Sequence, residues 1–321
     1  MTTFDVTLPP VQMKGLYRLE VRRPDGSLKW DSGWIDNLIT DAGLEALGQP
    51  VTLFAYCMVG TGNTAPAATD TALQTQVAYL ASGSGTTSAG IVTSSPRYGW
   101  QRVTFPFAQG AVTGNIAEVG IGWTTTAVLS RSLVSPAATI TSIDQLTVTY
   151  ELRMYLPTAD VTGTKTIGGT SYNYTIRAIK AASSSYAGQS SFGWAPNPNG
   201  LGASARAWTT TNGFAGYAGA CYGPSAQLST NIEDVALQLS GGGTASSSAP
   251  SSVSNASYVA NSLECQFTHI WSAAAANFSG IQGFIYSGFF GTYQCVLDAA
   301  LPKDNTKELQ MTWKQTWARR P

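Results

Sequence analysis

The sequence predicts an all-β protein made of two tandem, related, sandwich-like domains. Short segments alternate apolar and polar residues, turn residues separate these segments, and part of the pattern recurs in the second half. The clearest segment is Leu146–Tyr155, in which every second residue from Leu146 to Met154 is apolar. Alternation with a period of two places these side chains on one face of a strand, whereas a helix would scatter them.

A β-hairpin is predicted near the start of the chain. Tyr17–Val21 alternates apolar with charged residues, and Leu28–Trp30 continues the apolar pattern. Between them, Pro24-Asp25-Gly26 has the residues that a tight turn needs, because proline presets φ and glycine accepts a positive φ. Further strands are predicted at Leu53–Val59, Trp100–Phe107, Ile116–Trp123, Ala127–Leu133 and Leu146–Tyr155.

Two short helices are predicted in the first half. Thr40 or Asp41 can cap the first, which ends at Gly48, since a hydroxyl or carboxylate accepts from free N–H groups and glycine tolerates the last turn. The second is expected from Asp70 to about Val77. The Ser/Gly/Thr-rich stretch Ala81–Gly90 is predicted to be a loop.

An internal duplication indicates that the two halves are related. At an offset of about 163 positions, Gly120–Trp123 aligns with Gly283–Tyr286, and Leu146–Tyr150 aligns with Leu309–Trp313 in the same alternation. One departure is Gln315, which stands where the pattern has a leucine. Equal spacing between two matched blocks is typical of a repeated unit.

We therefore expect a first β-domain over residues 1–157 and a second over residues 158–321. The second is poor in charge, with only four charged side chains between Ala181 and Val296. It also contains Gly-, Ser- and Asn-rich stretches, which predict long loop insertions. These stretches are Gly188–Gly202, Thr209–Gly223 and Gly241–Ser257.

Charge and hydropathy exclude several classes of protein. The 321 residues include 18 basic and 18 acidic side chains, and charged residues make up 11%, under half the usual share of about 25%. A basic nucleic-acid binder and a polybasic membrane anchor are excluded, because both need excess positive charge. No apolar stretch reaches the length of a transmembrane helix.

Cysteine and histidine usage argues against most catalytic and metal sites. The four cysteines lie far apart without a CxxC pair, so we expect buried free thiols, with their pairing left open. His269 is the single histidine. On a strand it would share a face with Cys265 but lie about 13 Å away, too far for a nucleophile–base hydrogen bond. We expect no catalytic residue, cofactor or metal site.

Paired carboxylates are the remaining catalytic possibility, since glycoside hydrolysis needs only two. No pair is placed by its spacing, and we interpret Glu118 and Glu151 as solvated strand residues. The full set of candidates is Glu118, Glu151, Glu233, Asp234 and Glu264.

Aromatic residues in the Gly/Asn/Ser-rich stretches are the main candidate contact residues. Rigid aromatic rings beside small hydrogen-bonding residues are typical of recognition surfaces. One interpretation is that the rings close over sheet edges as core; the other is a subunit interface or a glycan contact. For the second interpretation the candidates are Trp194, Trp208, Tyr217 and Tyr222.

Two passages carry a resemblance to a known group of proteins. Trp34–Leu44 and Val59–Leu73 resemble consecutive phrases of tailed-bacteriophage virion proteins, and Glu118–Gly122 followed by Leu129–Arg131 continues the pattern. The resemblance covers roughly residues 15–157. It implies a structural part of a tail, baseplate or fibre, with no catalytic residue to carry over.

The expected function is thus a non-enzymatic component of a phage tail, as a baseplate, tail fibre or fibre-attachment protein. We expect it in the virion tail after synthesis in the host cytoplasm, bound to other tail proteins as a homo-oligomer. Tail symmetry, implied by the resemblance, suggests a trimer or hexamer. The alternatives are a receptor- or glycan-binding module at the tail tip, a tail-borne glycan hydrolase and a head decoration protein.

Overall fold

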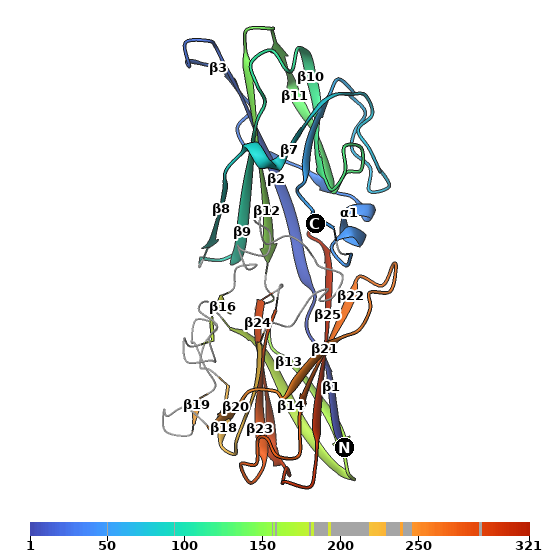
Figure 1. Cartoon of the computed structure of the whole chain (residues 1–321), viewed down its shortest axis with the longest axis vertical. Helices are drawn as coiled ribbons and strands as arrows, with labels where there is room; N and C mark the ends of the chain where they lie inside the picture. Colours follow the sequence, from blue (N-terminus) through green and yellow to red (C-terminus); the bar gives the residue numbers. More distant parts are fainter. Residues whose placement is uncertain are drawn as a thin grey trace. The chain divides into compact units, whose positions relative to one another are not determined.

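Over the residues that it describes, the computed structural model confirms the all-β class, with 57% strand and 3% helix. It describes residues 1–49, 51–92, 94–155, 157, 159–179, 181–182, 192–193, 218–228, 238–239, 246–288 and 291–321. In Figure 1 the chain is coloured from the N-terminus (blue) to the C-terminus (red), and most strands are labelled.

The described chain divides into two compact units. The N-terminal unit consists of Gln12–Met154 with Ala318–Pro321, and the C-terminal unit consists of Met1–Val11 with the described residues of Tyr155–Trp317. The change of unit after Met154 lies close to the division expected at residue 157. The two ends differ from that expectation, because each belongs to the unit formed mainly by the other half of the chain.

Two sheets form the N-terminal unit (Figure 1). The first has the order β5 (Leu38–Ile39), β11 (Ser130–Ile140), β10 (Gly114–Gly122), β6 (Tyr56–Gly60), β7 (Gln76–Ala81). The second has the order β2 (Val11–Arg22), β12 (Gln145–Tyr155), β9 (Tyr98–Pro106), β8 (Thr87–Val92), while β3 (Leu28–Asp31) and β4 (Ile35–Asp36) pair with β2.

The core of this unit follows the predicted alternation. Tyr17 from β2 and Tyr150 from β12 are fully buried, with ring centroids 5.0 Å apart. Val148 and Leu152 on β12 are buried on the same face. The predicted hairpin is confirmed as β2 and β3, with Gly26 at φ +81° in the turn, where a side chain would be strained.

One predicted helix is confirmed and the other is wrong. Helix α1 spans Asp41–Ala46, and the Thr40 side chain accepts a hydrogen bond from Gly43 N. The segment from Asp70 to Val77 instead leads into strand β7, which pairs with β6. Gln76–Ala81 has no strong local preference, so the neighbouring strand decides its conformation. The loop predicted at Ala81–Gly90 is wrong as well, because it contains the 3-10 helix η1 (Ser82–Ser84) and the start of β8.

The C-terminal unit also contains two larger sheets. One has the order β1 (Thr2–Thr7), β25 (Leu309–Arg319), β22 (Glu264–Trp271), β21 (Ser252–Asn255). The other has the order β13 (Val161–Ile167), β14 (Thr170–Ile179), β24 (Gly291–Leu301), β23 (Ile281–Gly288), β17 (Ala218–Tyr222), β20 (Ser247–Ser248). Two short pairs accompany them, β15 (Ala181–Ala182) with β16 (Phe192–Gly193) and β18 (Ala226–Gln227) with β19 (Gln238–Leu239).

Strand β1 explains why the start of the chain belongs to this unit. It pairs in parallel with β25, with Phe4 opposite Met311, and Figure 1 shows the blue β1 beside the red β25. The Phe4 ring is buried and stacks on Phe284 with centroids 5.8 Å apart. Parallel pairing between the first and last strands connects sequence-distant residues, which local patterns do not reveal.

Several stretches predicted as loops contain strands. Strand β17 lies inside the predicted Thr209–Gly223 loop, and β20 and β21 lie inside Gly241–Ser257. Small residues have weak intrinsic preferences, so pairing decides the outcome: β17 pairs with β23, β20 with β17, and β21 with β22.

The strand order in the two units is compatible with the predicted repeat. In the N-terminal unit, β10 lies between β11 and β6. In the C-terminal unit, β23 lies in the same way between β24 and β17. The strand with the clearest alternation in each unit is also followed by two further strands towards the sheet edge. The order is β12, β9, β8 in the N-terminal unit and β25, β22, β21 in the C-terminal unit. The superposition of Tyr150 on Trp313 stays a prediction. The departure at Gln315 has a structural reason, because its buried Nε2 donates to Pro9 O at 3.0 Å.

Candidate functional site

A buried ion-pair network lies in the N-terminal unit, where the resemblance segments meet. The Arg131 Nε donates to Glu118 Oε2 at 2.9 Å, and its Nη1 donates to Asp70 Oδ2 at 2.7 Å. The third nitrogen, Nη2, donates to Thr64 O at 2.9 Å. Each nitrogen of this guanidinium therefore has an oxygen partner, as a buried charge requires.

Glu118 is fully buried and accepts three further hydrogen bonds from backbone N–H groups. Its Oε1 accepts from Gly62 N at 3.1 Å and Thr75 N at 2.7 Å, and its Oε2 accepts from Gln74 N at 3.0 Å. These bonds join both ends of the loop between β6 and β7 to β10. The loop is thus held by one carboxylate.

Two glycines make room for this carboxylate. A side-chain Cβ at Gly60 would lie 2.6 Å from Glu118 Oε1, and one at Gly62 would lie 2.5 Å from the same atom. Both distances are shorter than real Cβ contacts, so the close approach of the loop requires glycine at these positions. This accounts for the Gly-Thr-Gly sequence in the second resemblance segment.

The first resemblance segment joins the same region through helix α1. The Thr40 hydroxyl, which caps the helix, donates to Val128 O at 2.8 Å, and Asp41 N donates to Ala68 O at 2.8 Å. A Cβ at Gly43 would lie 2.1 Å from Leu129 O. The helix therefore packs directly on the backbone that precedes β11.

Asp70 completes the network at its partly exposed side. Burial raises the pKa of this carboxyl, but the Ala67 N–H and the Arg131 guanidinium outweigh it, so the pKa lies below its usual range. Asp70 therefore remains ionised at neutral pH and keeps its bond to Arg131.

The interpretation of Glu118 as a solvated residue is wrong. Charged residues are rarely fully buried unless paired, and the arginine that pairs with it is 13 positions away. The nearby Gly-x-Gly is the signal that points to a close backbone approach. Because its oxygens already accept from Arg131 and three backbone N–H groups, the arrangement suits holding a loop in place and not proton transfer.

Glu151 is likewise buried, not solvated, at 1% side-chain exposure. Arg102 Nε donates to its Oε2, and Arg153 Nε donates to its Oε1 at 2.6 Å. The Arg102 guanidinium lies 5.0 Å from the Trp34 ring centroid and 4.4 Å from that of Trp100. These contacts form a half-exposed cluster of arginine and aromatic side chains on the outer face of the second sheet.

His269 is in the core of the C-terminal unit. Its ring is fully buried and lies 6.2 Å from the Tyr286 ring and 6.0 Å from the Trp271 ring, between centroids. Burial lowers the pKa of this imidazole to about 4. The Cys265 thiol donates to Gln315 O at 3.6 Å, so Cys265 and His269 do not form a nucleophile–base pair.

The four cysteines are buried and free, as predicted. Burial raises the pKa of the Cys57 and Cys295 thiols, which keeps them protonated and unreactive.

The Lys303 ammonium is held by a loop in the C-terminal unit. The side chain is 4% exposed, and desolvation lowers its pKa. Five oxygens surround its Nζ and share its three N–H donors: Ala275 O at 2.8 Å, Asn277 Oδ1 at 3.0 Å, Ser272 O, Ala273 O and Asp304 O. The hydrogen bonds of this lysine connect the loop after β22, residues 272–277, to the segment that follows β24.

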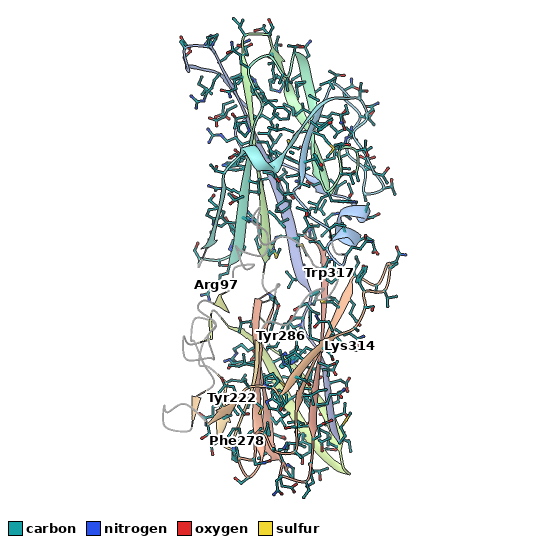
Figure 2. The ribbon with its side chains drawn as sticks, viewed as in Figure 1. Arg97, Tyr222, Phe278, Tyr286, Lys314 and Trp317 are labelled. Atoms are coloured by element: carbon teal, nitrogen blue, oxygen red, sulfur yellow. The ribbon has the colours of Figure 1, made fainter. Side chains whose placement is uncertain are left out.

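The predicted contact residues are only partly within the described chain. Trp194, Trp208 and Tyr217 lie outside the described residues. Tyr222 ends β17, and its side chain is fully buried; Figure 2 labels it in the C-terminal unit. A side chain with no exposed area cannot serve as a surface contact, so Tyr222 belongs to the core interpretation instead.

No cluster of three or more metal-ligating side chains occurs among the described residues. Within the same ranges, no helix has the length and hydropathy needed to span a membrane. A pocket of about 270 Å³ in the N-terminal unit is lined by residues that include Met13, Lys14, Asn37 and Arg319.

Comparisons with protein-family models, with curated proteins and with solved structures each find no significant match.

Proposed function

We propose that this protein is a non-enzymatic structural component of a phage tail, such as a baseplate, tail fibre or fibre-attachment protein. The support is the resemblance of Trp34–Leu44 and Val59–Leu73 to virion proteins, together with what these segments do in the fold. Their polar groups bond to each other and to Glu118 and Arg131. Such a motif serves rigidity rather than chemistry.

The Glu118–Arg131–Asp70 network is the observation that carries the proposal. It connects the segments that resemble virion proteins, and it uses their charged and glycine residues for internal contacts. A buried, fully bonded network stabilises one conformation of a loop. A rigid β-unit with a fixed loop suits a part that is repeated many times in an assembly.

Locating the chain in particles tests this proposal. Antibodies against the purified full-length chain are applied to intact phage particles and observed by immunogold electron microscopy. Label at the tail, baseplate or fibres is expected, together with co-purification of the chain with particles. Label on the head would assign a decoration role instead, and absence from particles would refute a virion role.

Glycan binding is the second candidate function, and the Arg102 cluster favours it. Trp34 is 39% exposed, and Arg102 is 39% exposed beside it. A flat aromatic face next to a guanidinium suits stacking on a sugar ring with hydrogen bonds to its hydroxyls. A glycan array probed with the full chain and with Trp34→Ala would support this function if binding is seen and the variant loses it.

A tail-borne hydrolase is the less favoured alternative. Incubation of the full chain with host surface polysaccharide, followed by a reducing-sugar assay, distinguishes it, because a structural protein releases none.

A further inference from the structure

Strand β7 (Gln76–Ala81) forms one edge of the first sheet in the N-terminal unit. Within the part of the chain that the structure describes, it pairs with β6 alone. An edge strand presents a row of backbone N–H and C=O groups that a further strand can pair with. Natural proteins usually protect such edges with charges, prolines or very short strands.

Several other edges among the described strands have these protections. Strands β5 and β20 have two residues each. Strand β13 carries Lys165, and β3 carries Lys29 and Asp31. In contrast, β7 has no charged residue and no proline, and it lies in a segment, 71–96, without a charged side chain. Strands β8 and β21 also lack a charge and a proline, and β21 exposes one large apolar side chain, Val253, whereas β7 exposes two.

Two large apolar side chains of β7 point outward. Val77 is 47% exposed and Tyr79 is 55% exposed. Tyr79 lies in the regular part of the strand, opposite Met58, whereas the register of β7 against β6 shifts by one residue at Val77. The Tyr79 ring packs edge-on against Tyr56 of β6, with centroids 6.1 Å apart. The result is an apolar strip along an edge that also offers backbone hydrogen-bonding groups.

We propose that β7 pairs in an antiparallel arrangement with β7 of a second copy of this chain. A two-fold axis through Tyr79, perpendicular to the sheet, places Tyr79 opposite Tyr79 and Val77 opposite Ala81. This register keeps each exposed side chain on its own face, because opposite residues in an antiparallel pair share a face.

The low charge of the chain favours a second copy of the chain, and not a charged protein, as the partner that pairs with β7. No like charges meet across the paired strands, since neither contributes a charged side chain. The whole chain carries 18 basic and 18 acidic residues, so long-range repulsion between two copies is small. A contact of one patch with itself is the usual form of a two-fold interface.

This inference rests on the assembly role proposed above and names one of its contacts. By itself, the β7 contact gives a dimer. If another surface of the chain forms a trimer, the β7 contact joins two trimers into a hexamer.

Sedimentation velocity of the full chain tests the contact. The wild type is expected to dimerise, and Tyr79→Lys is expected to raise the dimer dissociation constant by about tenfold or more, because two ammonium groups then meet at the axis. The matched control is Ile143→Lys, which adds the same charge at a position 57% exposed outside β7. Equal thermal melts of both variants show that each remains folded.

Disulfide trapping tests the register. A cysteine in Tyr79→Cys meets its own counterpart at a separation that a disulfide spans, whereas one in Val77→Cys lies opposite Ala81. Rapid covalent dimers are therefore expected for Tyr79→Cys and not for Val77→Cys or Ile143→Cys. The native thiols are buried and do not compete.

A wild type that stays monomeric, or a Tyr79→Lys variant that associates as tightly as the wild type, overturns the inference. Trapping of Val77→Cys as fast as Tyr79→Cys overturns the register. These outcomes are separate from particle labelling. If the chain is found in tails but its β7 variants associate as tightly as the wild type, the proposed function stands and the β7 contact is refuted.

Discussion

Arg131 and Glu118 form an ion pair, 2.9 Å between Nε and Oε2, in which the side chains are 3% and 0% exposed. The pair lies between adjacent strands β11 and β10, and Glu118 also accepts the backbone N–H groups of the β6–β7 loop. Its effect is to make the position of that loop depend on one buried charge.

Breaking this pair is expected to destabilise the protein strongly. Glu118→Gln keeps the size of the side chain but leaves Arg131 short of one negative partner, and removal of one member of a buried pair costs about 3–5 kcal/mol. The free energy of unfolding from urea denaturation measures this. Asp36→Asn removes the partner of Lys14 in an exposed pair and is the matched control, with an expected cost below about 1 kcal/mol. Similar losses for both variants would contradict the role of the network.

A charge in the core of β12 is expected to be severely destabilising. Val148→Asp buries a carboxylate where no partner is available, at a fully buried position, and should cost several kcal/mol, about 4 or more. The control is Thr147→Asp on the other face of the same strand, which is half-buried. Normal unfolding of Val148→Asp in urea would contradict the strand assignment.

His269 is expected to make the protein less stable in mild acid. The pKa of the buried imidazole is about 4, below its value of about 6.5 in an unfolded chain. The unfolded state therefore binds the proton first, and stability falls as the pH decreases from about 6.5 to about 4, by about 3 kcal/mol in total. Cys265 and Tyr286, the neighbouring titratable groups, remain protonated in this range because burial raises the pKa of each.

Urea midpoints of the wild type and His269→Leu at several pH values measure this effect. Carboxylates titrate in both proteins, so the difference between the two curves isolates the histidine. The wild type should lose stability relative to the variant as the pH falls below 6.5; parallel curves from pH 7 to pH 4 would show that the imidazole is not buried in its neutral form.

Removal of the Lys303 ammonium is expected to loosen the loop after β22. Lys303→Met keeps the aliphatic length but leaves the carbonyl oxygens of Ser272, Ala273 and Ala275 without this donor. Unsatisfied buried groups cost about 1–3 kcal/mol. Hydrogen exchange over residues 272–277 should accelerate in this variant. Lys307→Met, which removes only an exposed pair with Asp304, should change neither exchange nor stability.

The sequence by itself determined the features that depend on neighbouring residues. Alternation in β12, the turn at Gly26 and the Thr40 cap each arise from steric and hydrogen-bonding preferences within a few residues. The all-β class follows from the sum of such local preferences. The burial of the cysteines follows from their apolar character.

Tertiary structure alone decided the features that depend on sequence-distant partners. Gln76–Ala81 is a strand because β6 pairs with it, and Glu118 is buried because Arg131 and the β6–β7 loop satisfy its charge. Strand β1 joins the C-terminal unit because β25, about 300 residues later, supplies its hydrogen bonds. Local propensity differs by less than about 1 kcal/mol between such alternatives, so long-range pairing and the need to satisfy buried polar groups determine the outcome.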